Sequence, residues 1–256
     1  MTGKSIEGAG GLHIIVTGAS SGLGEAMARS LAGGGHRVVL VARRAEAIER
    51  LRTEINPSGR RVIAAPGDVT DPADVERVLV RAHGAFGPVD VLINNAGVGG
   101  GGPRWWQRDP AEAMRVFDVN VLAAVRLTGL VLPEMLERRT GHIINIGSVA
   151  ARVPAGGLYA ASKSGLRGFS LALRRDLAGT GVSVSLVEPG FIRTPMTEGQ
   201  TRVPMPGPEV VGRLMVDLVE HPRAEVVIPA WYRTIIWLAN TFPGLADSYA
   251  RRFRPQ

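Results

Sequence analysis

The chain has 256 residues, of which 45% are hydrophobic and 21% charged, a composition typical of a soluble globular protein with one sizeable core. It contains no cysteine, which excludes disulfides, thiolate nucleophiles and cysteine metal sites and agrees with a cytoplasmic location. The five histidines lack the spacing of metal ligands, so no metal is expected.

The formal net charge is +7, and the arginines are dispersed along the chain in pairs, such as Arg43 with Arg44 and Arg251 with Arg252. Dispersed arginines are typical of a solvated surface. A nucleic-acid site would need a basic run or stripe, so nucleic acid is not expected as a partner. Residues 1–10 are polar and glycine-rich and lack the apolar run of a signal peptide. No stretch reaches the roughly 18 apolar residues expected of a membrane-spanning helix.

The first predicted strand, residues 12–17, ends in a glycine-rich turn that reads TGASSGLG over residues 17–24. A predicted helix over residues 25–32 follows it. Glycines here let the backbone approach a pyrophosphate, and the N-terminus of the helix offers unpaired N–H groups to phosphate oxygens. Glycine clusters also form plain turns, as we expect for residues 33–35. The strand before this turn and the helix after it favour nucleotide binding.

The second predicted strand, residues 37–42, is followed by Arg43 and Arg44 at the start of a helix over residues 45–55. Dinucleotide-binding folds often place an acidic residue here to hold the adenosine ribose hydroxyls, and such an acid would repel a 2′-phosphate. Arginine instead suits a phosphate. The alternative is that the two arginines only form the solvated start of a helix. That arrangement is mildly unfavourable, because their positive charges lie at the positive end of the helix dipole. The sequence therefore predicts NADP(H) in preference to NAD(H).

The rest of the chain continues the alternation of strands and helices. Further strands are predicted over residues 61–65, 89–93, 141–147, 182–187 and 225–228. Further helices are predicted over residues 72–86 with Asp71 as N-cap, 111–138, 157–178 and 208–220. This order predicts an α/β fold with a Rossmann-type, doubly wound parallel sheet of about seven strands and helices on both faces. Since no linker or repeat interrupts it, residues 1–256 are expected to form a single domain.

Tyr159 and Lys163 lie four residues apart in the predicted helix over residues 157–178, so they share one helix face. An ammonium beside a phenol lowers the phenol pKa and brings it closer to use as a general acid or base. Alone, this spacing occurs by chance in many surface helices. Here Ser148 follows the fifth strand directly, and ligands of doubly wound sheets bind at the carboxyl ends of the strands. The context therefore favours a catalytic site.

Together, these motifs resemble the short-chain dehydrogenase/reductase family in its single-domain branch of about 250 residues. The resemblance extends from about residue 12 to about residue 200. It rests on TGASSGLG (17–24), Asp68, NNAG (94–97), Asn120, Ser148, YAASK (159–163) and EPGFIRTPM (188–196).

The resemblance implies an oxidoreductase that transfers a hydride between a nicotinamide cofactor and a carbonyl or secondary alcohol. Tyr159 would act as the general acid or base, and Ser148 would hydrogen-bond the same substrate oxygen. Lys163 would hold the nicotinamide ribose and lower the Tyr159 pKa, and Asn120 would hold a water that relays protons to Lys163. Besides Tyr159 and Lys163, the expected cofactor contacts are Gly18, Ser20, Ser21, Gly22, Leu23, Gly24, Arg43, Arg44, Asp68, Val69, Asn94, Ala96, Gly97, Pro189, Gly190, Ile192 and Thr194.

Several of these assignments have a structural alternative. Asn120 could be a polar residue on a helix face, Asp68 could begin a turn, and Thr194 could cap a helix. Ser148 and Tyr159 are 11 residues apart, about two fewer than is common in the family. The two side chains can therefore meet only if the loop over residues 151–157 brings them together.

The substrate side is less defined by the sequence. Residues 191–208 are expected to form a lid over a small, apolar carbonyl or alcohol substrate, and Trp105 and Trp106 either line that site or anchor a loop. The apolar and then basic segment 231–256 could cap the pocket, pack in an oligomer or contact a membrane surface. By resemblance, a homodimer or homotetramer is expected. A cofactor-binding sensor or scaffold is the alternative to an enzyme, and the intact Ser148, Tyr159 and Lys163 set disfavours it.

Overall fold

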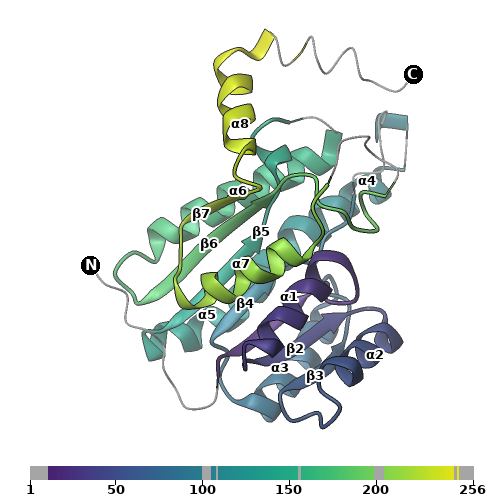
Figure 1. The fold of residues 1–256 in the computed structure, drawn as a ribbon, viewed down its shortest axis with the longest axis vertical. Helices are drawn as coiled ribbons and strands as arrows, with labels where there is room; N and C mark the ends of the chain where they lie inside the picture. Colours follow the sequence, from purple (N-terminus) through teal and green to yellow (C-terminus); the bar gives the residue numbers. More distant parts are fainter. Residues whose placement is uncertain are drawn as a thin grey trace.

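The computed structural model describes residues 11–99, 105–107, 109–154, 157–198, 205–244 and 247. Seven parallel strands form one sheet in the order β3-β2-β1-β4-β5-β6-β7 (Figure 1). The strands are β1 (His13–Thr17), β2 (Arg37–Ala42), β3 (Val62–Pro66), β4 (Val91–Asn94), β5 (Gly141–Ile146), β6 (Val182–Pro189) and β7 (Glu225–Ile228). All seven predicted strands are present, and the prediction of a doubly wound parallel sheet is confirmed.

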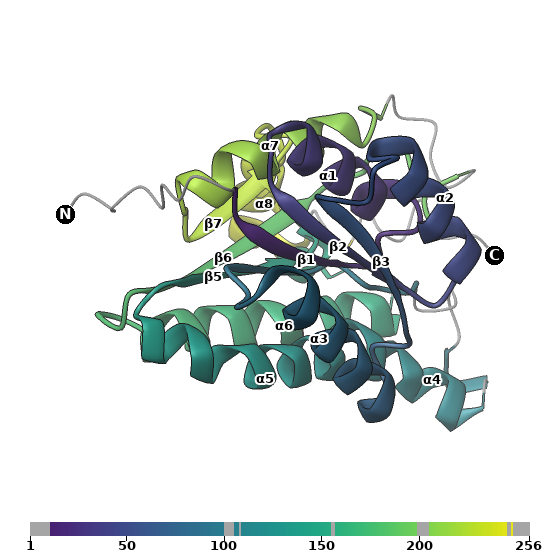
Figure 2. The ribbon, with the colours of Figure 1, turned by 90° about the horizontal axis from the view of Figure 1, so that it is seen from below.

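Helices cover both faces of the sheet, with α1, α2 and α7 on one face and α3, α5 and α6 on the other (Figure 2). The helices are α1 (Gly22–Gly33), α2 (Ala45–Ile55), α3 (Pro72–Phe86), α4 (Pro110–Phe117), α5 (Ala123–Arg138), α6 (Gly157–Asp176), α7 (Glu209–Glu220) and α8 (Tyr232–Thr241). As the sequence predicts, the Asp71 side chain caps α3 by accepting a hydrogen bond from the Ala73 N–H.

The central strands are apolar throughout because both faces of the sheet are covered. In β1, Ile14 and Val16 point into the core beneath α1 and α7, whereas Ile15 points into the core beneath α3 and α5. All three side chains are fully buried. This arrangement leaves the carboxyl ends of the strands, where side chains need not be apolar, as the place for a polar site.

The predicted single helix over residues 111–138 is interrupted. A π-helical turn over Asp118–Leu122 separates α4 from α5, and it contains the buried Asn120. The Asn120 side chain bonds to Val98 and Ser162 rather than to solvent. Such π turns insert one extra residue into a helix and often occur at functional sites. A periodicity argument cannot detect it, because the flanking residues keep a helical pattern.

The run Pro110–Arg138 is also long and apolar enough, by length and composition, to cross a membrane, although the sequence contains no uninterrupted apolar stretch of that length. In the structure its inner face packs on the sheet. Leu127, Val131 and Met135 are buried beside β4 and β5. Such packing on a sheet is typical of a helix in the core of a globular protein.

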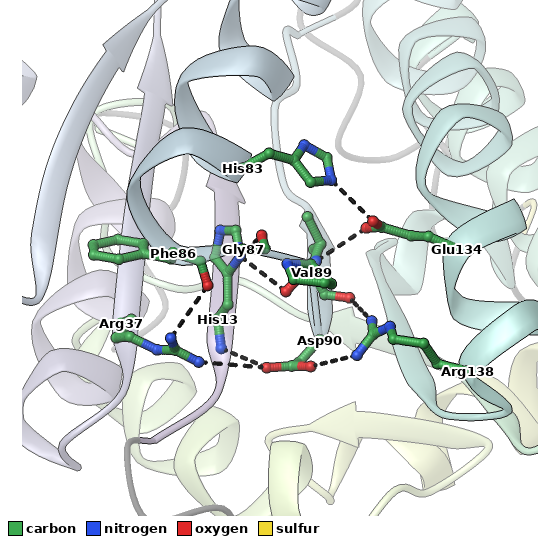
Figure 3. Close-up of polar contacts among 10 residues, drawn as sticks. His13, Arg37, His83, Phe86, Gly87, Val89, Asp90, Glu134 and Arg138 are labelled. Atoms are coloured by element: carbon green, nitrogen blue, oxygen red, sulfur yellow. Dashed lines mark hydrogen bonds and ion pairs between the residues drawn. The ribbon is translucent and has the colours of Figure 1, made fainter.

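A polar network ties the amino-terminal edge of the sheet together (Figure 3). Asp90, just before β4, accepts hydrogen bonds from the His13 backbone N–H at 2.9 Å and from Arg138 Nη1 at 3.0 Å, and it lies 3.9 Å from Arg37 Nη2. Glu134 of α5 accepts from the Val89 N–H at 3.0 Å. These contacts join β1, β2, β4 and α5 at the edge opposite the predicted cofactor site.

Replacing Asp90 by Asn keeps the side-chain shape but removes the charge that pairs with Arg138 and Arg37. Since the Asp90 side chain is only 18% exposed, we expect a loss of about 1–3 kcal/mol in the free energy of unfolding, measured by urea denaturation. Asp217→Asn is the matched control because Asp217 pairs with Arg223 on the surface, where ion pairs contribute less than about 1 kcal/mol. Equal losses in both variants would contradict a special role for the network.

Candidate active site

A cavity of about 350 Å³ opens at the carboxyl ends of the strands, where the chain order reverses between β1 and β4. Ligands of doubly wound sheets bind at this switch point. The cavity is lined by these predicted site residues: Gly18, Ser20, Ser21, Gly22, Leu23, Arg43, Arg44, Asp68, Val69, Ala96, Gly97, Ser148, Tyr159, Lys163, Pro189, Gly190, Ile192 and Thr194. The structure therefore brings most of the predicted residues to one place.

The glycine-rich turn is shaped by close backbone contacts. Gly18 has a φ of 66°, and a Cβ added there would lie 2.9 Å from the Ala96 Cα. A Cβ at Gly24 would lie 2.2 Å from the Gly18 carbonyl oxygen, so Gly24 must lack a side chain for α1 to pack onto the turn. Ser21, the N-cap of α1, makes no side-chain cap. The first N–H groups of α1 can therefore bind a phosphate, and the cradle fits a dinucleotide.

Asn95 locks the turn to the end of β4. Its Nδ2 donates to the Thr17 carbonyl oxygen at 2.8 Å. The Thr17 hydroxyl oxygen accepts from the backbone N–H groups of Asn95 and Ala96 at 2.9 and 3.0 Å. Asn95 was not among the predicted contacts, although it belongs to the NNAG motif. It is the motif residue that fixes the two loops to each other and lines the cavity.

Arginine side chains flank the end of the cavity beside β2. Arg44 Nη2 donates to the Ser20 and Ser21 hydroxyl oxygens at 2.9 and 2.8 Å. Arg43 Nη1 lies 3.8 Å from Asp68 Oδ2. Burial alone would raise the pKa of Asp68, but hydrogen bonds from Thr70 and the nearby charge of Arg43 leave that pKa below its ordinary value. Asp68 is therefore ionised at neutral pH, and Arg44 lies over the glycine-rich turn.

Tyr159 and Ser148 meet despite their short separation in sequence. A hydrogen bond with Ser148 lowers the pKa of the Tyr159 phenol, but burial raises it by more, so the net pKa lies above its ordinary value. The Ser148 hydroxyl oxygen also accepts from the Ala150 N–H at 3.1 Å and caps a short 3-10 turn over Val149–Ala151. Both Ser148 and Tyr159 line the cavity.

Lys163 is buried beneath the same wall. Its Nζ donates to the Ile146 carbonyl oxygen at 2.8 Å and lies 5.9 Å from the centroid of the Tyr159 ring. Burial lowers the pKa of Lys163 to about 8. Burial dominates the Tyr159 pKa in this structure, and the Lys163 ammonium donates to the Ile146 carbonyl oxygen. The expected lowering of the Tyr159 pKa by Lys163 stays a prediction.

Three predicted contacts, Gly24, Asn94 and Asn120, lie behind the cavity wall. Asn94 Nδ2 donates to Asn145 Oδ1 at 2.9 Å and to Thr128 Oγ1 at 3.2 Å inside the core. Asn120 accepts from the Val98 N–H at 2.8 Å and donates to the Val98 carbonyl oxygen at 3.0 Å and to Ser162 Oγ at 2.9 Å. Asn120 thus anchors the loop after β4, and its side chain supports the wall beside Lys163.

An ion-pair cluster fixes the loop between Ser148 and Tyr159. Arg152 Nε donates to Glu188 Oε2 at 2.6 Å, and Arg152 also pairs with Glu225. Arg167 Nη2 lies 3.1 Å from Glu225 Oε2. Glu188 is fully buried, and burial raises its pKa although Arg152 opposes the shift. The cluster joins this loop to the end of β6, and sequence patterns missed it because its members lie up to 73 residues apart.

The start of the predicted lid packs against α8. The Phe191 N–H donates to Tyr232 Oη at 3.1 Å, and Thr197 Oγ1 donates to the Ile192 carbonyl oxygen at 2.6 Å. Residues 199–204 of the lid lie outside the described residues. Trp105 lies beside the start of α6, where a Cβ at Gly157 would be 3.3 Å from its Cδ1, and neither Trp105 nor Trp106 is among the residues that line the described cavity.

The fold and this site define a class of protein, the nicotinamide-cofactor oxidoreductases built on a Rossmann-type sheet. The short chain dehydrogenase family model matches residues 12–203. The chain therefore belongs to the short-chain dehydrogenase family, whose members are NAD(P)-dependent oxidoreductases that act on alcohol and carbonyl groups.

Relatives and solved structures agree with that assignment. The chain is 36% identical to the ketoacyl reductase HetN of a Nostoc species over 226 residues, which cover 85% of this chain and 78% of HetN. A short-chain dehydrogenase/reductase from Burkholderia phymatum in complex with NAD superimposes with a TM-score of 0.82 at 30% identity, covering 92% of this chain and 95% of that one. A variant of actinorhodin polyketide ketoreductase with NADPH superimposes with a TM-score of 0.78 at 29% identity, covering 85% of this chain and 95% of that one.

Replacing Lys163 by Met tests the burial of its charge. The unfolded chain keeps the lysine proton up to the ordinary pKa of 10.5, whereas the folded chain releases it near 8. Between these values the unfolded state binds more protons, so the stability of the wild type relative to Lys163→Met rises with pH. We expect this difference in the free energy of unfolding to grow by about 3 kcal/mol between about pH 7 and about pH 10.5, measured by urea denaturation. If the difference in the free energy of unfolding between the wild type and Lys163→Met did not change with pH, the lowered pKa of Lys163 would be contradicted.

Proposed function

We propose that this chain is an NADP(H)-dependent oxidoreductase that transfers a hydride between the nicotinamide and a carbonyl or secondary alcohol, with Tyr159 as the general acid or base. One observation carries the proposal. Ser148, Tyr159 and Lys163 share one wall of a cavity whose other end holds the glycine-rich turn and Arg44. The similarity to ketoacyl and polyketide ketoreductases supports a carbonyl substrate.

The protonation states of the site suit reduction. Because its pKa is raised, the Tyr159 phenol keeps its proton at neutral pH and can donate it to a carbonyl oxygen. Ser148, in contact with Tyr159, is placed to donate a hydrogen bond to the same oxygen. A bound nicotinamide cofactor supplies or accepts the hydride. Lys163, with a pKa of about 8, is mostly protonated at neutral pH, and its charge stabilises the phenolate that Tyr159 leaves behind.

The preference for NADP(H) rests on the residues after β2. Where an acid would hold ribose hydroxyls, Ala42 is followed by two arginines, and Arg44 lies against the Ser20 and Ser21 hydroxyls at the cavity rim. A guanidinium and two hydroxyls suit the 2′-phosphate of NADP(H). Solved relatives include complexes with NADPH and with NAD, so the family alone leaves the choice open.

The proposal also includes the substrate, the location and the oligomeric state of the enzyme. The substrate is small and apolar, and the protein is cytoplasmic and forms a homodimer or homotetramer. Exposed apolar side chains on the helices after β4, namely Met114, Leu122, Val125 and Leu130, support self-association.

Replacing Tyr159 by Phe removes the proton donor but keeps the ring that packs in the wall. We expect turnover of a ketone panel, followed by NADPH oxidation, to fall by at least roughly a hundredfold, since general acid catalysis contributes about that much or more. NADPH affinity, followed by fluorescence titration, should stay within about twofold of wild type. Wild-type turnover in this variant would overturn the mechanism, and a wild type that binds NADPH but reduces no carbonyl would favour a sensor.

Replacing Arg44 by Ala tests the cofactor preference. We expect NADPH to bind the wild type more tightly than NADH, and Arg44→Ala to reduce the ratio of the two affinities by roughly tenfold, because a charged hydrogen bond contributes about 1.5–3 kcal/mol. Arg50→Ala is the matched control, since Arg50 lies on α2 with its side chain 70% exposed and lines no part of the described cavity. If Arg44→Ala left the ratio of NADPH to NADH affinity unchanged, residues other than Arg44 would determine the cofactor preference.

A further inference from the structure

The turn between β3 and α3 forms one side of the cavity. Gly67, Asp68 and Val69 of this turn line the cavity. The Asp68 carboxylate folds the turn onto itself, because its Oδ1 accepts from the Thr70 N–H at 2.9 Å and from the Thr70 hydroxyl at 2.7 Å. The Asp71 N–H donates to the Asp68 carbonyl oxygen at 3.0 Å. The position of this turn therefore determines the shape of the cavity on this side.

Two charged side chains from two helices hold the turn. Asp74, on the first turn of α3, accepts from the Asp68 N–H at 2.8 Å. Arg126, on the first turn of α5, donates from Nη1 to the Val69 carbonyl oxygen at 3.3 Å and to the Thr70 carbonyl oxygen at 3.2 Å. Carbonyl oxygens away from water need such donors. Arg126 is half-buried and is not among the residues that line the described cavity, so it acts on the cavity through the turn.

We propose that Arg126 is a positioning residue for the adenosine half of the cofactor. The inference rests on the proposed function, which places the 2′-phosphate at Arg44 and therefore the adenosine at the end of the cavity beside β2. Asp68 lies at this end, with its Oδ2 3.8 Å from Arg43 Nη1. Because Arg126 holds the turn in one position before the cofactor arrives, binding does not have to order Asp68 and Val69.

Arg126 and Arg44 contribute in ways that can be separated. Arg44 is placed to meet the phosphate that distinguishes NADPH from NADH, whereas Arg126 holds a turn that faces the adenosine common to both. Loss of Arg126 therefore weakens both cofactors alike. The loop after β4, beside Lys163, is held instead by Asn120, which accepts from the Val98 N–H at 2.8 Å. The catalytic wall thus keeps its support when Arg126 is replaced.

Replacing Arg126 by Gln tests the proposal, because glutamine keeps a polar side chain that favours a helix but lacks the charge and the reach of arginine. The probe is AMP, the adenosine monophosphate unit that both cofactors share, titrated by calorimetry. We expect the affinities for AMP, NADPH and NADH to fall roughly five- to tenfold each, because a charged hydrogen-bond donor and the preorganised turn are lost. The ratio of NADPH to NADH affinity and the kcat at saturating NADPH should stay within about twofold of wild type.

Three further variants serve as controls. Arg126→Met keeps the apolar stem and should lose AMP affinity as Arg126→Gln does, so the measurement survives if one of the two variants fails to fold. Arg126→Lys should keep AMP affinity within about threefold of wild type, because a single nitrogen makes both hydrogen bonds and a lysine can supply one. Arg81→Gln is the matched control, since Arg81 is exposed on α3 and lines no part of the described cavity. It should bind AMP as the wild type does.

Wild-type AMP affinity in Arg126→Gln or Arg126→Met would overturn the proposal. A fall in kcat as large as the fall in AMP affinity would also overturn it, because Arg126 would then support the whole site and not its adenosine end. The proposed function fails separately, if the wild type binds neither NADPH nor NADH. Cofactor binding by the wild type that is unchanged when Arg126 is replaced overturns the positioning role alone.

Discussion

The contacts of Thr17 with the loop after β4 are the constraint on which the site depends. In a doubly wound sheet the strands on either side of the switch point lead their loops apart, and that separation opens the crevice. Here the Thr17 hydroxyl donates to the Ile93 carbonyl oxygen at 3.2 Å and accepts from the N–H groups of Asn95 and Ala96. The glycine-rich turn and the loop after β4 are therefore held in one geometry, and the walls of the cavity are built outward from this junction.

Burial then determines the electrostatics of the opposite wall. Lys163 is buried and Tyr159 is partly buried, and each shifts toward its neutral form, the phenol by a raised pKa and the ammonium by a lowered one. The lysine charge is partly compensated by the Ile146 carbonyl oxygen at 2.8 Å. A neutral phenol beside a readily titrated lysine is suited to donating a proton to a carbonyl oxygen. Burial therefore affects the protonation of Tyr159 and Lys163 more than ion pairing does.

The ion-pair cluster of Arg152, Arg167, Glu188 and Glu225 shows how a short loop can still position Ser148. The loop after β5 begins with a 3-10 turn that Ser148 caps, and Arg152 then ties it to the end of β6 through the buried Glu188. Breaking a buried pair of this kind leaves an uncompensated charge, so the loop has few alternative positions. The spacing of 11 residues, which by itself cast doubt on Ser148, is thus compatible with contact between Ser148 and Tyr159.

The sequence by itself determined the features that depend on local periodicity. The β-branched runs of β1 and β2 predicted buried strands, the glycines from Gly18 to Gly24 predicted the turn, and the helical spacing fixed Tyr159 and Lys163 on one face. Only the tertiary structure decided the features that depend on distant residues. It placed Asn94 in the core, put Asn120 in a π turn behind the wall, and raised the Tyr159 pKa through burial. The reason is physical: burial and hydrogen-bond partners come from segments that lie side by side only after folding.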